Sequence, residues 1–218
     1  MAVVVLLLLL YYFTKSSGIS MSDMQEGSTM LEVPASKIPG DASSNYTYSM
    51  WFFVDDWGYK YGQKKILLQR TDEATGESIP EVYLGETENN VNIKIGCMGN
   101  QNHTCKVENV PLQKWVNLII SLNGRSLDVY VDGKLIRTCV LPATTLTSSN
   151  APLTITPNGG FKGWTSSFVY WAAPTSPKEA YNIYKKGYGG SMMGNLFNKY
   201  RMRLTFVKDG RELNSFEV

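Results

Sequence analysis

The chain has 218 residues, enough for one sizeable domain with appendages, and its 21 basic and 19 acidic residues leave a net charge of only +2. This balance, and the lack of any Lys/Arg block in the sequence, argue against a nucleic-acid partner. The single histidine, His103, excludes most His-based catalysis and multi-His metal sites. The three cysteines lack the CxxC spacing of a zinc site, so we expect no metal and no cofactor.

An unbroken apolar run of twelve residues, AVVVLLLLLYYF, occupies positions 2–13. As a helix it would be about 18 Å long, short of the roughly 30 Å hydrocarbon core of a bilayer. We favour a retained membrane anchor over residues 1–14. Its lipid-facing residues and interfacial tyrosines would be Val3, Leu6, Leu10, Tyr11 and Tyr12. Two alternatives stay open: a secretory signal cleaved near residues 16–18, and a buried strand or core helix.

Residues 15–28 are polar and rich in Ser, Gly and Met, and we expect them to form a linker. Beyond them, short apolar segments recur about every ten residues with turn residues between them, which is typical of a sandwich or jelly roll. Outside the central meander, strands are expected at residues 30–33, 46–54, 65–69, 80–84, 91–96, 105–110, 153–156 and 166–171.

The segment 115–141 predicts three strands joined by two tight turns. Apolar residues occupy every second position of 116–122 and again of 127–131, the period expected of a half-buried strand. Asn123-Gly124 and Asp132-Gly133 supply the positive φ angles that hairpin turns need. An antiparallel sheet with one apolar face follows, and such a sheet needs a second layer to cover it.

One helix is expected after this all-β region, because Ser176-Pro177-Lys178-Glu179 forms a capping box and Gly187 can end the helix. Residues 188–218 then predict a Gly-rich joint and a C-terminal β-hairpin that turns at Asp209-Gly210. An isolated hairpin is marginal in water. It therefore either docks on the sandwich, which we favour, or pairs with a neighbouring molecule.

Four segments together resemble the concanavalin A-like lectin/glucanase domain and its laminin-G-like relatives. They are residues 46–54, 114–136, 151–171 and 176–187, which hold an aromatic strand, the meander, a Phe-x-Gly motif and the helix. The resemblance covers residues 29–187 and implies an antiparallel β-sandwich of the concanavalin A-like jelly-roll type. It does not imply one function, because this fold hosts lectins, glucanases, receptor modules and structural proteins.

The glucanases of this superfamily place carboxylates in an E-x-D-x-x-E string, which this sequence lacks. The close acidic pairs Asp55-Asp56, Asp72-Glu73 and Glu86-x-Glu88 fit solvated loops better. We therefore expect no enzyme. Asp128 and Asp132 face outward on the meander, but Asp132 is explained by its turn, so we assign no metal ligand.

Aromatic residues offer the best candidates for binding. The loop DDWGYKYG contains Trp57, Tyr59 and Tyr61, which with Trp164 are our candidate contacts for a glycan or a protein. Trp51 and Trp171 lie within apolar strands and are expected in the core.

The cysteines permit two interpretations. Cys97 and Cys105 flank a seven-residue loop of an expected hairpin, so they form either a disulfide or a reduced buried pair, while Cys139 is expected as a core thiol. Asn45-Tyr46-Thr47 and Asn102-His103-Thr104 are glycosylation sequons, used only if the domain enters the secretory lumen.

The anchor, the segment SMWFFVDDWGYKYG and the C-terminal extension together are similar to membrane-anchored minor capsid proteins of large icosahedral algal DNA viruses. That resemblance implies a non-enzymatic virion protein between internal membrane and capsid shell, whose partners are other capsid proteins and the lipid membrane. The alternative is a carbohydrate-binding module of the secretory pathway or cell surface, with a glycan as partner. A third hypothesis is that the protein is a glycoside hydrolase.

Overall fold

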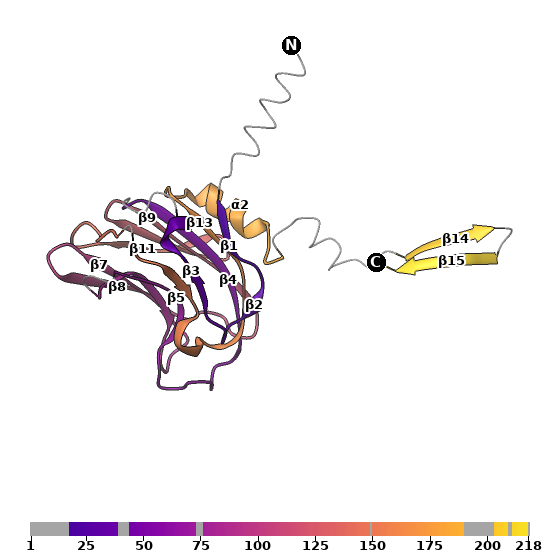
Figure 1. Ribbon diagram of the computed structural model, residues 1–218, viewed down its shortest axis with the longest axis horizontal. Helices are drawn as coiled ribbons and strands as arrows, with labels where there is room; N and C mark the ends of the chain where they lie inside the picture. The colour runs from indigo at the N-terminus through magenta and orange to yellow at the C-terminus, as the bar shows by residue number, and fades with distance from the viewer. Residues whose placement is uncertain are drawn as a thin grey trace, which may run out of the picture.

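Two antiparallel sheets stacked face to face form the body of the protein (Figure 1). The computed structural model describes residues 18–38, 44–72, 76–148 and 150–189, and the strand backbone at 203–208 and 211–217. Sheet A has the order β1-β13-β4-β9-β10-β11, with β2 also paired to β13, and sheet B has the order β3-β12-β5-β6-β7-β8. The architecture confirms the all-β sandwich expected from the alternating sequence pattern.

Most strands follow the predicted bounds. Sheet A contains β1 (Ile19–Ser22), β2 (Gln25–Glu26), β4 (Tyr46–Asp56), β9 (Trp115–Asn123), β10 (Ser126–Val131), β11 (Lys134–Val140) and β13 (Lys162–Trp171). Sheet B contains β3 (Leu31–Val33), β5 (Lys65–Thr71), β6 (Ser78–Leu84), β7 (Val91–Cys97), β8 (Gln101–Val107) and β12 (Leu153–Ile155). Short 3₁₀ turns, η1 (Ala35–Lys37) and η2 (Pro157–Gly159), and the helix α2 (Pro177–Lys185) complete the sandwich.

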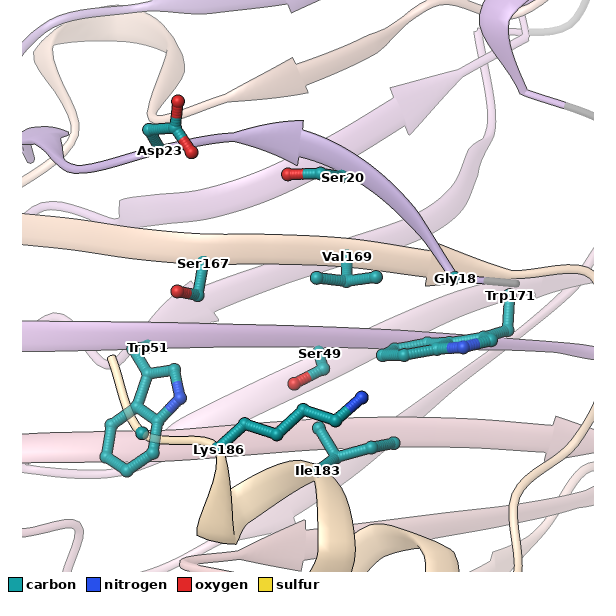
Figure 2. A pocket seen from close by; sticks show the side chains of 11 residues that line it. Gly18, Ser20, Asp23, Ser49, Trp51, Ser167, Val169, Trp171, Ile183 and Lys186 are labelled. Atoms are coloured by element: carbon teal, nitrogen blue, oxygen red, sulfur yellow. The ribbon is translucent and has the colours of Figure 1, made fainter. Parts of the chain in front are cut away.

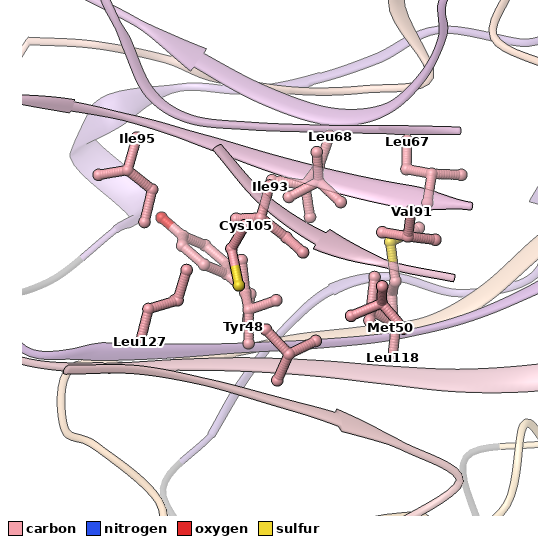
Figure 3. Packing of buried hydrophobic residues seen from close by; sticks show 14 of the residues in the cluster. Tyr48, Met50, Leu67, Leu68, Val91, Ile93, Ile95, Cys105, Leu118 and Leu127 are labelled. Atoms are coloured by element: carbon pink, nitrogen blue, oxygen red, sulfur yellow. The ribbon is translucent and has the colours of Figure 1, made fainter. Parts of the chain in front are cut away.

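The core lies between the sheets and is built from alternate residues of each strand. Tyr48, Met50 and Leu118 of sheet A point toward Val91 and Ile93 of sheet B (Figure 3), and each of the five side chains is at most 2% exposed. Complete burial of one such side chain contributes roughly 1.5–3 kcal/mol. The predicted meander forms, with Leu127 opposite Leu122 and opposite Cys139. Asp132 and Gly133 have the expected positive φ, whereas in the first turn Gly124 has it and Asn123, the last residue of β9, does not.

The helix α2 lies on the outer face of sheet A. Ser176 Oγ accepts a hydrogen bond from Glu179 N at 3.3 Å, and Ser176 N donates to Glu179 Oε2 at 2.9 Å, so the predicted capping box is confirmed. Ala180 is fully buried against Ile119 and Tyr130, which face away from the main core. The helix thus covers the part of sheet A that carries outward apolar residues.

The expected linker is partly wrong, because β1 and β2 lie inside residues 15–28. Both strands add to β13 at the edge of sheet A, with Ile19 opposite Tyr170 and Gln25 opposite Thr165. The segment shows little apolar alternation of its own, so its strand state comes from the backbone hydrogen bonds that β13 offers. Local sequence could not show this pairing across more than a hundred residues.

Cys97 and Cys105 were expected to form either a disulfide or a reduced pair, and Cys139 was expected to be a core thiol; these predictions are wrong. The structure joins Cys105 to Cys139 with Cα atoms 6.1 Å apart and leaves Cys97 as a buried free thiol. The turn that follows β7 is tighter than predicted, so β8 already begins at Gln101. Cys97 therefore lies opposite Gln101, and Cys105 lies opposite Ile93. Burial raises the pKa of the Cys97 thiol, which keeps it protonated.

Several expectations fall outside the described residues. These are the anchor residues Val3, Leu6, Leu10, Tyr11 and Tyr12, and much of the Gly-rich joint. Within the described ranges, no helix has the length and apolar character needed to span a bilayer. The C-terminal hairpin is formed by β14 (Arg203–Lys208) and β15 (Arg211–Glu217), which pair with each other in a separate two-stranded sheet.

Candidate functional site

Three loops meet at one end of the sandwich. They are residues 57–64 after β4, 85–90 after β6 and 108–114 before β9. Backbone hydrogen bonds join them: Gly62 N donates to Glu86 O at 3.0 Å, and Val110 N donates to Asn89 O at 2.8 Å. These bonds hold the loops in fixed positions beside the outer face of sheet B.

A shallow hollow of about 280 Å³ lies where the middle loop overhangs this face. We call it the rim cleft and define it by Tyr83, Glu88, Asn90, Asn92 and Lys106, all of which line it. Tyr83, Asn92 and Lys106 are neighbours across three adjacent strands, since Asn92 pairs with both of the others. A second hollow of about 290 Å³, which also contains Glu88, Asn90 and Lys106, continues it toward Glu108 and Asn109.

Hydrogen bonds connect the polar groups of the rim cleft into one network. Lys106 Nζ lies 2.8 Å from Glu88 Oε2 and 3.4 Å from Glu108 Oε1. Asn90 Nδ2 donates to Glu88 Oε2 at 2.9 Å, and Asn92 Nδ2 donates to Asn90 Oδ1 at 2.8 Å. The hydrogen bond from Lys106 lowers the pKa of Glu88, and the same bond raises the pKa of Lys106. Both groups therefore carry full charge at neutral pH.

This arrangement suits ligand hydroxyls better than bond cleavage. Amide, carboxylate and ammonium groups offer donors and acceptors on one surface, with the half-buried Tyr83 ring beside them. The Lys64 ammonium lies 4.4 Å from the centre of that ring and 3.7 Å from Glu81 Oε1. A glycosidase needs an acid whose pKa is raised, whereas that of Glu88 is lowered.

The predicted aromatic contacts divide into structural and exposed residues. Trp57 is half-buried with the Lys65 ammonium 4.4 Å from its ring, and Tyr59 Oη donates to Gly159 O at 3.1 Å. Tyr61 is 63% exposed in the loop that borders the rim cleft. Trp164 is 43% exposed but lies on the outer face of sheet A, where it pairs with Phe53.

Among the residues that line the rim cleft, sequence reasoning named only Glu86 and Glu88 and assigned them to a solvated loop. In β7, Asn92 and Lys94 alternate with buried Val91 and Ile93, so the pattern already places the polar side chains on the outer face. The sequence does not show that the 85–90 loop folds over them, because that position depends on contacts with two other loops.

A second cleft, of about 240 Å³, lies on the outer face of sheet A between β1 and the end of α2. We call it the helix cleft; its lining includes Gly18, Ser49, Trp51, Trp171 and Lys186. Figure 2 shows the Lys186 side chain extending between the two tryptophans. The expectation that Trp51 and Trp171 lie in the core is wrong. Trp51 is buried against Tyr184 of α2, with ring centroids 5.5 Å apart, and Trp171 is half-buried in the helix cleft.

Of the acidic pairs considered from sequence, Glu86-x-Glu88 lines the rim cleft, and Glu88 belongs to its network. The other two pairs were Asp55-Asp56 and Asp72-Glu73, and Glu73 lies outside the described residues. Asp55 and Asp56 are exposed at the end of β4, and Asp56 Oδ1 accepts a turn hydrogen bond from Gly58 N at 2.7 Å. His103 is half-buried on β8, a strand where a loop was expected. Within the described ranges, no three His, Cys, Asp or Glu side chains are grouped closely enough to hold a metal ion.

Comparison with known proteins identifies the fold and the superfamily of the chain. Solved structures of low sequence identity share its fold, an antiparallel β-sandwich. Residues 25–180 match the concanavalin A-like lectin/glucanases superfamily, and the chain belongs to that superfamily. A search of curated protein sequences found no match.

Three solved structures illustrate the likeness. The binding domain of botulinum neurotoxin serotype G is 14% identical with a TM-score of 0.53, over 78% of this chain and 47% of that one. The binding domain of botulinum neurotoxin DC was solved with SialylT (15% identity, TM-score 0.54, 65% and 35% coverage). It was also solved with rat synaptotagmin II (12% identity, TM-score 0.57, 78% and 45% coverage). This chain spans less than half of each toxin domain, and the likeness concerns the fold alone.

Proposed function

We propose that the chain is a non-enzymatic, membrane-tethered binding module that takes a glycan in the rim cleft. The observation that carries this proposal is the charged and amide network of Glu88, Asn90, Asn92 and Lys106 beside the Tyr83 ring. Sugars present hydroxyls to such networks and a C–H face to an aromatic ring. A toxin domain of the same fold, solved with SialylT, supports the ligand class.

The Cys105–Cys139 disulfide supports a location for this module in an oxidising compartment. Disulfides form and persist in oxidising environments such as the secretory lumen and cell or virion surfaces. We therefore propose that the sandwich functions at a surface, held by the apolar segment 2–13 in a membrane.

The test is a glycan-array screen of the full chain followed by titration of the best ligand. Replacing Asn92 with Ala removes a network donor, and replacing Tyr83 with Ala removes the ring, so each change should weaken binding about tenfold or more. Lys94→Ala is the matched control, because Lys94 lies on the same face of β7 outside the cleft. Equal affinity of all four proteins, or no bound glycan, would contradict the site.

A structural role in a virion is the second candidate, favoured by the separate hairpin. Strands β14 and β15 pair only with each other in the sheets that the structure describes, and a two-stranded hairpin is marginal in water. Addition to a capsid protein would supply a further strand. Cross-linking within purified particles tests this role: cross-links from residues 203–217 to capsid proteins support it, and absence of the chain from particles refutes it.

A further inference from the structure

The outer face of sheet A carries a continuous row of aromatic rings, which we call the aromatic strip: Phe53, Trp115, Tyr188, Trp51 and Tyr184. Successive ring centroids lie 5.8, 4.6, 5.9 and 5.5 Å apart. The hydroxyls of two serines on β13 donate to the backbone oxygen of Tyr188 and hold that residue in the strip. The strip therefore belongs to the rigid sandwich.

Each end of the strip continues into an exposed aromatic side chain. Trp164, opposite Phe53 on the neighbouring strand, is 43% exposed. Tyr181, whose ring lies 6.2 Å from Tyr184, is 49% exposed. Tryptophan and tyrosine side chains, which combine an apolar ring with a polar atom, are the residues that proteins place at a membrane–water interface.

Lysines gather at the α2 end of the same face. Lys178 and Lys185 of α2 are exposed, and Lys185 Nζ lies 5.5 Å from the Tyr181 ring centre. Lys186 lines the helix cleft. The one carboxylate of α2, Glu179, is engaged in the capping box. The loops at the end of sheet B differ, since Glu86, Glu88 and Glu108 there are all exposed.

The apolar segment of the sequence joins the sandwich at this face. Gly18 lies flat on Trp171, where an added Cβ would be 2.4 Å from the indole Cε2, and it lines the helix cleft. Figure 1 shows β1 beginning beside α2. Phe13, the last residue of the apolar run, is five residues before Gly18 and so at most about 18 Å away along an extended chain. A bilayer that holds residues 2–13 must therefore lie close to the aromatic strip.

We propose that the outer face of sheet A beside α2 docks on an anionic lipid surface. Trp164 and Tyr181 enter the interface, and Lys178, Lys185 and Lys186 contact headgroup phosphates, each worth a several-fold gain in binding near such a surface. This inference rests on the membrane tether of the proposed function. Because the outer faces of stacked sheets point in opposite directions, it turns the rim cleft away from the lipid and toward a ligand.

The test uses the full chain on vesicles of phosphatidylcholine and phosphatidylserine, with pure phosphatidylcholine vesicles as reference. Flotation with the vesicles measures attachment through the tether. Amide hydrogen exchange over residues 177–189 measures whether the proposed docking face is covered by lipid. Vesicles that contain phosphatidylserine should slow this exchange about tenfold. The double variant K178Q/K185Q should lose most of that protection while the protein still floats. The matched double variant K37Q/K94Q neutralises two lysines outside this face and should behave like the wild type.

Each outcome decides one part. Flotation without protection of residues 177–189, or protection that is equal in K178Q/K185Q or on pure phosphatidylcholine, overturns the docking surface and leaves the tether. Failure to float overturns the tether and the docking surface together, whereas glycan binding by the rim cleft is measured without vesicles. Unfolding midpoints of both double variants, which should match the wild type, exclude a loss of fold as the cause.

Discussion

Lys65 lies in an environment that disfavours the charged form of its ammonium group. It is fully buried at the start of β5, its Nζ has no hydrogen-bond partner among the described residues, and it lies 4.4 Å from the Trp57 ring centre. Burial lowers the pKa of Lys65, and the Glu86 carboxylate opposes that effect. The cation–π contact offsets part of the desolvation cost and no more.

We predict that Lys65→Met raises the free energy of unfolding by about 1 kcal/mol or more at pH 7, because an unpaired buried charge is exchanged for an apolar chain of similar length. The pH dependence has a definite sign. Between the lowered folded pKa and the ordinary value of 10.5, the unfolded chain binds more protons, so wild-type stability rises with pH in that interval. The variant should lose this rise, as measured by urea unfolding at a series of pH values from neutral up to 10.5; an unchanged slope just below 10.5 would contradict the assignment.

Gly163 shows how one residue can fix a motif. Its φ of +149° disfavours other residues, and an added Cβ would lie 1.9 Å from Phe53 O on the neighbouring strand. Close approach of β13 to β4 therefore requires glycine here. The Phe-x-Gly motif that suggested the fold from sequence has this physical cause.

At the scale of elements, the disulfide joins the two sheets at one side of the sandwich. Cys105 lies on β8, the last strand of sheet B, and Cys139 lies on β11, the last strand of sheet A. Arg137 Nη1 donates to Lys106 O at 2.9 Å across the same gap. The two edge strands, which would otherwise be free to separate, are thereby held together.

We predict that loss of this disulfide lowers stability by about 4 kcal/mol, the value expected when a closed loop of this size is released. The separation of the two cysteines is 34 residues. Cys105→Ala or Cys139→Ala should show the loss in a thermal unfolding experiment, and reducing agent should produce it in the wild type. Cys97→Ala is the control, because its stability should still fall on reduction. A wild type insensitive to reduction would refute the pairing.

At the scale of the whole molecule, the sandwich presents two different outer faces. One carries aromatic rings and lysines beside α2, and the other carries the rim cleft. The proposed lipid-docking surface and the proposed glycan cleft therefore lie on opposite faces of the sandwich.

Deletion of residues 195–218 should leave cooperative unfolding of the sandwich unchanged within about 0.5 kcal/mol, because β14 and β15 form their own sheet. The same deletion should weaken assembly with a partner if the hairpin adds to a neighbouring molecule. Urea unfolding and size-exclusion chromatography of both chains provide the measurement. A large loss of stability would show that the hairpin docks on the sandwich.

Much of the fold was predictable because it depends on local pattern. The meander alternates apolar and polar residues with Gly124 and Gly133 at its turns, and the capping box of α2 is a four-residue signal. The candidate site was less predictable. Tyr61 and Trp164 are exposed as expected, but the network around Asn92 depends on loops distant in sequence.

The sequence by itself determined most strands of the sandwich and the place of its helix, since the period of two and the cap depend on neighbouring residues. Only the tertiary structure decided that Cys105 pairs with Cys139, that β1 joins β13, and that Gly18 and the aromatic strip share one face. Each of these facts depends on which distant strands become neighbours. Packing between the sheets determines which strands become neighbours, and no short segment of the chain does so.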